Sequence, residues 1–320
     1  MQLKLGVSTG FAIKRWADPG DWVRIVKEEL GLDTVQFSLD QFDPRSRPDN
    51  SAAYAYRVRN ACAKFGVVLH STFTGLSIYS HNLLMHPLWE GRRDGVDWFE
   101  KAFALTEALG ASGTGGPYGG MDIASYQAVE RREAIERSAE ECMAYLLSQA
   151  PRYGIDTFYW EQTPIRREGP VGIEDTLRHL ERMNALRDPQ GAAFALCLDV
   201  GHAIAPDAEG EDRDPYRWLE KLAPYAPIIH LQQTDGRYDR HWPFTPEFND
   251  KGIIDGVRVL EAIRRSGTDG ALLLIEVGHP FEESDAKVLG DMKRTADYWR
   301  ESLKRGAGLE GGEQTHGSYR

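Results

Sequence analysis

The chain has 320 residues, of which 41% are hydrophobic, and its formal net charge is −11. This charge argues against nucleic acid as a partner, because an acidic surface repels phosphate backbones, and no apolar stretch is long enough to span a membrane. The cysteines Cys62, Cys142 and Cys197 are far apart and form no CxxC pair, which argues against a disulfide framework and favours a cytoplasmic location.

Short apolar segments alternate with longer amphipathic ones along the chain, which predicts alternating strands and helices. Strands are predicted at residues 3–9, 33–39, 67–74, 110–116, 155–163, 194–202, 227–235 and 271–278. Helices are predicted at residues 21–30, 51–66, 96–111, 130–154, 173–186, 215–226, 253–267 and 284–305. Gly66, Gly154 and Gly267 stand where three of these helices should end.

Eight strand–helix pairs in a chain of this length predict an α/β protein made of a single (β/α)8 TIM barrel over residues 1–305. The structural alternative is a doubly wound open sheet. Such a sheet usually carries a glycine-rich phosphate turn after its first strand, and the segment STGFAIKRW at residues 8–16 is not one. Residues 306–320 are rich in glycine and polar types, so we expect a disordered C-terminal tail.

Four successive predicted strands carry a carboxylate or an imidazole near their carboxyl ends. In chain order these groups are Glu161, Asp199, His230 and Glu276. The carboxyl ends of TIM-barrel strands share one rim, where the active site lies. Burying three carboxylates together is costly unless a cation neutralises them, so we predict one divalent metal held by all four residues. The oxygen-rich set suits Mn²⁺, our first choice, or Mg²⁺, Co²⁺ or Zn²⁺.

Other residues near the same rim are candidates for substrate contacts. His70 is either a core histidine or a substrate contact. Aromatic faces suit the apolar side of a small ligand, although core packing is the alternative for each ring. The rings expected to wall the site are Phe11, Phe73, Trp160 and Trp242.

The segments around these residues resemble the xylose-isomerase-like TIM-barrel superfamily, whose members include sugar isomerases, epimerases and AP endonucleases. The resemblance covers residues 3–305. It is carried by WEQTP around Glu161, LDVGH around Asp199, IIHLQQTD around His230, LIEVG around Glu276, and DRHWPF…KGIID over 239–255.

The ketose 3-epimerase branch of that superfamily implies the same four metal ligands. It also implies substrate contacts from His202 and from an arginine after the seventh strand, either Arg237 or Arg240. That branch has a second glutamate shortly after the fifth-strand ligand, where this sequence has Arg166 and Arg167. These arginines indicate either an anionic group near that loop or a solvated basic loop. The resemblance further implies a homo-oligomer, a dimer or tetramer.

These residues predict a divalent-metal-dependent sugar isomerase or epimerase. Its substrate would be a short sugar, a tetrose, pentose or branched relative, free or phosphorylated. The cation would polarise the carbonyl and stabilise an enediolate, while Glu161 and Glu276 would be the catalytic base and acid. Reprotonation of the same carbon gives epimerisation and reprotonation of its neighbour gives aldose–ketose isomerisation, and the sequence favours neither outcome.

Two other functions are compatible with this rim. An AP-endonuclease-type multi-metal phosphodiesterase could use Asp239 and His241, with His70 and His202, as further ligands. The segment GTGGPYGG at 113–120 lacks the histidine expected there, and the net charge is unsuited to DNA. A non-catalytic sugar-binding barrel would not need two glutamates in the site.

Overall fold

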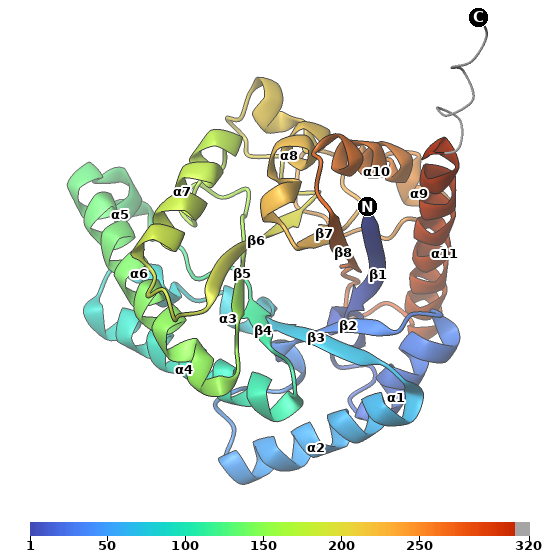
Figure 1. Ribbon diagram of the computed structural model, residues 1–320, viewed down its shortest axis with the longest axis horizontal. Coiled ribbons are helices and arrows are strands. Elements are labelled where there is room, and N and C mark those ends of the chain that lie inside the picture. The colour runs from blue at the N-terminus through green and yellow to red at the C-terminus, as the bar shows by residue number, and fades with distance from the viewer. Residues whose placement is uncertain (311–320) are drawn as a thin grey trace, which may run out of the picture.

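The strands form a closed barrel in which β1 to β8 follow one another in chain order. The computed structural model describes residues 1–310, and Figure 1 views it along the barrel. Every neighbouring pair of strands is parallel, and the pairing of β1 with β8, from Gln2↔Gly270 to Val7↔Ile275, closes the ring. The helices surround this ring, as a helical crossover between parallel strands requires. The predicted TIM barrel is confirmed.

Strands and helices alternate from Gln2 to Glu310. The strands are β1 (Gln2–Ser8), β2 (Thr34–Ser38), β3 (Val68–Phe73), β4 (Gly113–Gly115), β5 (Thr157–Glu161), β6 (Ala193–Asp199), β7 (Ile228–Leu231) and β8 (Gly270–Ile275). The α-helices are α1 (Pro19–Arg24), α2 (Pro48–Phe65), α3 (Leu76–Tyr79), α4 (Trp89–Leu109), α5 (Ile123–Gln127), α6 (Val129–Gln149), α7 (Ile173–Leu186), α8 (Pro215–Leu222), α9 (Pro246–Asn249), α10 (Gly256–Arg265) and α11 (Asp285–Glu310).

The predicted elements differ from the observed ones mainly at their boundaries. The helix predicted over 130–154 divides into α6 and a 3-10 turn over Ala150–Tyr153, because Pro151 cannot donate a helical hydrogen bond. The short helices α3, α5 and α9 lie in loops and were not predicted. Helix α11 continues to Glu310, so residues 306–310 belong to it. The rest of the segment predicted as a tail, 311–320, lies outside the described residues.

The apolar core has two layers. The outer layer packs the helices against the sheet and contains the fully buried rings of Trp22, Trp218 and Trp299. A smaller cluster lies on the inner side of the strands, and its members are Phe73, Tyr159, Cys197, Ile228, Leu272 and Leu274. The short β4 approaches β5 so closely that a Cβ at Gly115 would lie 2.1 Å from the carbonyl oxygen of Tyr159. Glycine is therefore required there.

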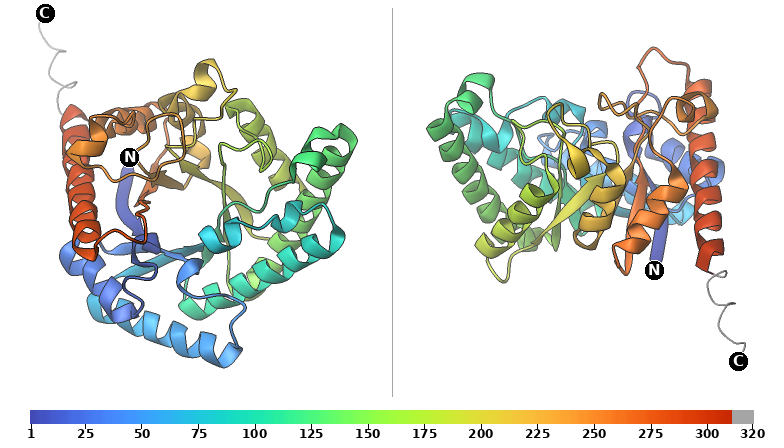
Figure 2. Two further views of the ribbon diagram at one scale, coloured as in Figure 1. Left: turned by 180° about the vertical axis from the view of Figure 1, so that it is seen from behind. Right: turned by 90° about the horizontal axis from the view of Figure 1, so that it is seen from above.

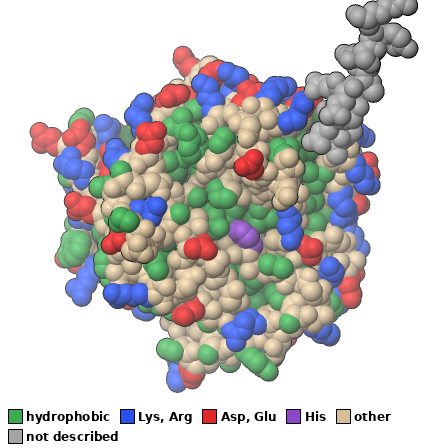
Figure 3. All heavy atoms as spheres, viewed as in Figure 1, with side chains coloured by type: hydrophobic (Ala, Val, Ile, Leu, Met, Phe, Trp, Pro, Cys, Tyr) green, Lys and Arg blue, Asp and Glu red, His purple; other side chains and the backbone are tan. Residues whose placement is uncertain are grey.

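The two ends of the barrel carry different structures. In the side view of Figure 2 the N-terminus marks the lower end, where the strands begin, and the loops after the strands rise at the upper end. On the face shown in Figure 3, acidic and basic side chains are interspersed. Among the described residues no helix is long and apolar enough to cross a membrane.

Candidate functional site

Four side chains meet inside the upper end of the barrel, as the sequence predicted. One ligand atom from each of Glu161, Asp199, His230 and Glu276 lies within 4.8 Å of the other three. The Nδ1 atom of His230 is 2.9 Å from Glu161 Oε1 and 2.9 Å from Glu276 Oε2. The four residues come from β5, β6, β7 and the position after β8, so the parallel register of neighbouring strands brings them to one level.

Gln36 of β2 determines which nitrogen of His230 faces the carboxylates. The amide nitrogen of Gln36 donates to Ser71 Oγ at 3.3 Å, so its Oε1 is free to accept from His230 Nε2 at 2.8 Å. With a single proton on Nε2, the ring would present the lone pair of Nδ1 to Glu161 and Glu276. A lone pair beside two carboxylate oxygens is the arrangement that a cation between them would satisfy.

Two acids of this group, Asp199 and Glu161, are buried and have too few protein partners to favour their charged forms without a cation. Asp199 is 1% exposed, and its Oδ1 accepts from the backbone N–H of Gly201 at 2.6 Å. Its Oδ2 is buried and has no hydrogen-bond partner among the described residues. Burial raises the pKa of both Asp199 and Glu161. A divalent ion would reverse that shift, so the donor set fits such an ion.

A second polar group adjoins the first. His202 Nδ1 donates to the carbonyl oxygen of Gln162 at 2.7 Å, which leaves its Nε2 3.2 Å from Asp239 Oδ2. His241 Nε2 lies 3.2 Å from Asp239 Oδ1, and its Nδ1 lies 3.7 Å from Glu276 Oε2. His202, Asp239 and His241 therefore also form a group with metal-ligand spacing. His241 has a φ of 47°, a strained value for a non-glycine residue that recurs at functional sites.

A cavity of about 490 Å³ opens above both groups. Its wall includes Glu161, His202 and Glu276, which lie on or just after their strands, and the ring of Phe73. That ring stands edge-on to His230 with centroids 4.8 Å apart. Thr74 and Thr163 also line the cavity, and their buried hydroxyls have no hydrogen-bond partner in the described part of the chain. Such a volume, with polar groups converging on it, suits a small hydroxylated ligand.

The structure separates the two arginines that the sequence left as alternatives. Arg240 lines the cavity, and its guanidinium donates to Asp235 Oδ2 from Nε at 3.2 Å and from Nη2 at 2.8 Å. The same guanidinium lies over the ring of Trp242, 5.1 Å from the ring centroid. Arg237 does not line the cavity and is exposed. Trp242 thus supports Arg240 and is not itself part of the cavity wall.

Three other predicted contact residues lie away from the cavity. Phe11 is 4% exposed and packs against Trp16, and Trp160 is 1% exposed and packs in the outer layer against His179. Both rings fill the core, which was the alternative for each. His70 is half-buried, lines a depression at the lower end of the barrel and contacts Ser71 Oγ at 3.1 Å.

Sequence reasoning missed Glu168, which directly follows the two arginines of the loop after β5. Its Oε2 accepts from the hydroxyl of Tyr79 at 2.9 Å, and Tyr79 lines the cavity. Arg166 instead forms an ion pair with Asp207, and Arg167 donates to the carbonyl oxygen of Met121 at 2.6 Å. The signal available in the sequence was an acid shortly after Glu161. It was missed because it stands one position beyond Arg166 and Arg167.

Comparison with known proteins identifies a matching family and a related protein. The profile of the family described as xylose isomerase-like TIM barrel matches residues 24–304. A D-erythrulose 1-phosphate 3-epimerase of Brucella abortus (strain 2308) is 26% identical over 309 residues, which cover 96% of this chain and 98% of that protein.

Solved structures agree with this result. A protein from Rhodospirillum rubrum ATCC 11170, assigned provisionally as a xylose isomerase, is 30% identical with a TM-score of 0.85, and the match covers 94% of this chain and 99% of that one. D-psicose 3-epimerase from Clostridium cellulolyticum H10, solved with D-tagatose, has a TM-score of 0.70 at 15% identity, with 94% and 99% coverage. The latter likeness concerns the fold alone.

Proposed function

This chain belongs to the xylose isomerase-like TIM barrel family, and on that premise we propose that it is a divalent-metal-dependent 3-epimerase of a short phosphorylated ketose. The observation that carries the proposal is the group formed by Glu161, Asp199, His230 and Glu276 beneath a cavity with unpartnered hydroxyls. The substrate class is suggested by the Brucella abortus relative, whose similarity extends over nearly the whole of both chains.

The four grouped side chains would hold the metal. A bound divalent ion supplies Lewis acidity, which polarises a substrate carbonyl and stabilises negative charge on its oxygen. Mn²⁺ is our first choice, because the ligand set combines three carboxylates with one imidazole. Gln36 orients the imidazole of His230, and the N–H of Gly201 orients the carboxylate of Asp199.

Two glutamates are placed to move the proton. Glu161 and Glu276 come from β5 and the end of β8, on either side of the His230 strand, and each touches His230 Nδ1 with one oxygen. The other oxygen of one glutamate would take the proton from the carbon next to the carbonyl. The second glutamate would return a proton to the opposite face of that carbon, which inverts it.

Two cavity residues would bind the rest of the substrate. His202 would contact a substrate hydroxyl, because its ring is fixed by Gln162 and lines the cavity. Arg240 would bind the phosphate through Nη1 and the second proton of Nη2, because its Nε and the first proton of Nη2 already serve Asp235. The stacking on Trp242 holds that guanidinium at the cavity wall. A free sugar would lack this ionic contact and bind more weakly.

The test is a substrate panel followed by NMR in D₂O with Mn²⁺ present. The panel contains erythrulose 1-phosphate, free erythrulose, a pentulose and a hexulose. We expect deuterium at C3 of the ketose and appearance of the 3-epimer, fastest with the phosphorylated tetrulose. An aldose product with deuterium at C2, formed from one of the free ketoses, would identify an isomerase instead. No exchange with any ketose would reject the proposal and favour a barrel that binds sugar without turnover.

The group of His202, Asp239 and His241 keeps a multi-metal phosphodiesterase as the second candidate. Those residues are already joined to one another, and the amide of Gln232 donates to Asp239 Oδ1 at 2.7 Å. The net charge of −11 also disfavours DNA. Metal stoichiometry separates the two candidates, because a phosphodiesterase of this type requires several ions per chain and the epimerase requires one.

A further inference from the structure

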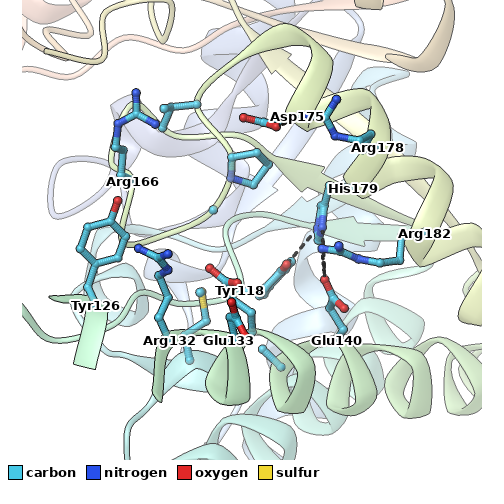
Figure 4. Close-up of a pocket in the computed structure, with 16 residues that line it drawn as sticks. Tyr118, Tyr126, Arg132, Glu133, Glu140, Arg166, Asp175, Arg178, His179 and Arg182 are labelled. Carbon is cyan, nitrogen blue, oxygen red and sulfur yellow. Dashed lines mark hydrogen bonds and ion pairs between the residues drawn. The ribbon is translucent and has the colours of Figure 1, made fainter. Parts of the chain in front are cut away.

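A second cavity lies outside the barrel, between α6, α7 and the loop that precedes α7. Its volume is about 470 Å³, and it shares no lining residue with the cavity above the metal-ligand group. Figure 4 shows Tyr126, Arg132 and Arg166 on one side of this cavity and Asp175, Arg178, His179, Arg182 and Glu140 on the other. The proposed epimerase reaction uses none of these residues.

Most charges around the second cavity are satisfied within the protein. Arg178 pairs with Asp175, and Arg182 pairs with Glu140. At the floor, the hydroxyl of Tyr118 donates to Nε2 of the buried His179 at 2.9 Å. Burial lowers the pKa of His179 to about 3, so its ring is neutral at physiological pH. Within these two pairs the positive and negative charges balance.

Two charged side chains of α6, those of Arg132 and Glu136, differ from these paired residues. Arg132 forms no ion pair among the described residues and lies over the ring of Tyr126, 5.2 Å from the ring centroid. Glu136, one turn further along α6, also lines the cavity, and the described part of the chain shows no hydrogen bond or ion pair for it. Burial raises the pKa of Glu136, although Arg132 opposes that shift. Arg132 and Glu136 therefore attract each other electrostatically, and within the described residues neither has a hydrogen bond or an ion pair that would keep it from a ligand.

We propose that this cavity binds a small hydroxylated anion, a sugar phosphate or a sugar acid, with Arg132 on the anionic group and Glu136 on the hydroxyls. A guanidinium held on an aromatic ring keeps its hydrogen-bond donors in one plane, which suits phosphate and carboxylate oxygens. A carboxylate is the acceptor that sugar hydroxyls need. The volume is within the range of small-molecule sites.

The experiment is isothermal titration calorimetry on the metal-loaded full chain with four probes. Glycerol 3-phosphate and D-gluconate represent the two sources of the anion, inorganic phosphate lacks hydroxyl-bearing carbons, and glycerol lacks charge. The test variant is Arg132→Ala. Its matched control is Arg131→Ala, because Arg131 is the neighbouring arginine of α6, is exposed and does not line the cavity. Circular dichroism verifies that each variant is folded.

We expect at least one hydroxylated anion to bind, with a dissociation constant raised roughly tenfold or more by Arg132→Ala and less than about twofold by Arg131→Ala. Glu136→Gln should weaken the binding of the hydroxylated probe and leave the binding of inorganic phosphate unchanged. The identity of the better probe decides between phosphate and carboxylate. Absence of binding by both hydroxylated anions at millimolar concentration would overturn the proposal, as would equal binding by wild type and Arg132→Ala, which would locate the anion elsewhere.

Discussion

Each end of the barrel has a histidine on a strand, and these two histidines have different surroundings. His230, near the carboxyl end of β7, is fully buried and lies between the amide of Gln36 and two glutamates. His70, near the start of β3, is half-buried and contacts Ser71 Oγ and the ring of Tyr159, with the two ring centroids 5.7 Å apart. The same side chain is a candidate ligand at one end and a packing element at the other.

This difference shows that position along the strand decides what a polar residue can do in this fold. At the carboxyl end the four candidate ligands converge from neighbouring strands, whereas none of the metal-ligand groups found among residues 1–310 includes His70. At the upper end the buried Oδ2 of Asp199 has no hydrogen-bond partner among the described residues. The following predictions test this difference between the two ends of the barrel, in order of decreasing expected effect.

The largest effect is expected from Glu276→Gln. The amide keeps the shape of the side chain but cannot take a proton, so kcat for epimerisation should fall by roughly 10²–10⁴-fold. Deuterium exchange at C3 of the ketose, measured by NMR, reports the loss directly. Glu283→Gln, in the exposed loop after β8, is the matched control and should retain wild-type activity. Retention of full exchange by Glu276→Gln would remove this glutamate from the mechanism.

Arg240→Ala is expected to act on binding. Loss of a charge-assisted pair with phosphate should raise KM for a phosphorylated ketose by roughly 10–100-fold, with a smaller change for the free sugar. Arg237→Ala provides the control, because Arg237 belongs to the same loop but does not line the cavity. If both variants raise KM equally, the effect comes from the loop as a whole and the phosphate contact is wrong.

His179, in the outer layer, extends the comparison to a histidine that is neutral in the folded protein. Burial lowers its pKa from 6.5 to about 3. The unfolded chain therefore binds one more proton between these values, and stability should decrease as pH falls from 6.5 towards 3 by up to about 1.4 kcal/mol per pH unit. His179→Gln should lose this dependence. Urea unfolding at pH 6.5, 5.5 and 4.5 measures it, and parallel curves for both proteins would contradict the buried neutral ring.

The smallest effect is expected from His70→Gln. Its ring lies at the lower end of the barrel, away from the substrate cavity. We therefore expect kcat/KM within about twofold of wild type and a modest loss of stability, of the order of 1 kcal/mol, from the lost packing. Steady-state kinetics and thermal unfolding check both values. A hundredfold loss of activity without unfolding would show that His70 contributes to the reaction from the lower end of the barrel, which contradicts this account.

The barrel was predictable because the same sequence pattern, an apolar segment followed by an amphipathic one, is repeated along the chain. Each helix buries one face against the sheet, and alternation of apolar and amphipathic segments records that burial directly. The weakest segment, at 110–116, still forms β4, since glycine at 115 is what the close approach to β5 demands. Short helices such as α3 and α9 were not predicted, because four residues are too few to show a period.

The candidate site was predictable where strand position determines it and not where loops do. Glu161, Asp199, His230 and Glu276 converge because strand ends share one rim. Loop residues have no such constraint, so the choice of Arg240 over Arg237 needed the structure. Trp160 was misplaced for another reason: a residue next to a strand-end ligand alternates to the opposite face, and here that face meets the helices.

The central claim, one divalent ion held by four strand-end residues, is tested most directly by titrating the apo-protein with Mn²⁺ and measuring free Mn²⁺ by electron paramagnetic resonance. The account predicts one tight site per chain in wild type and in His70→Gln, with an affinity at least tenfold lower in Asp199→Asn. Equal binding by Asp199→Asn and wild type, or several tight ions per chain, would contradict it.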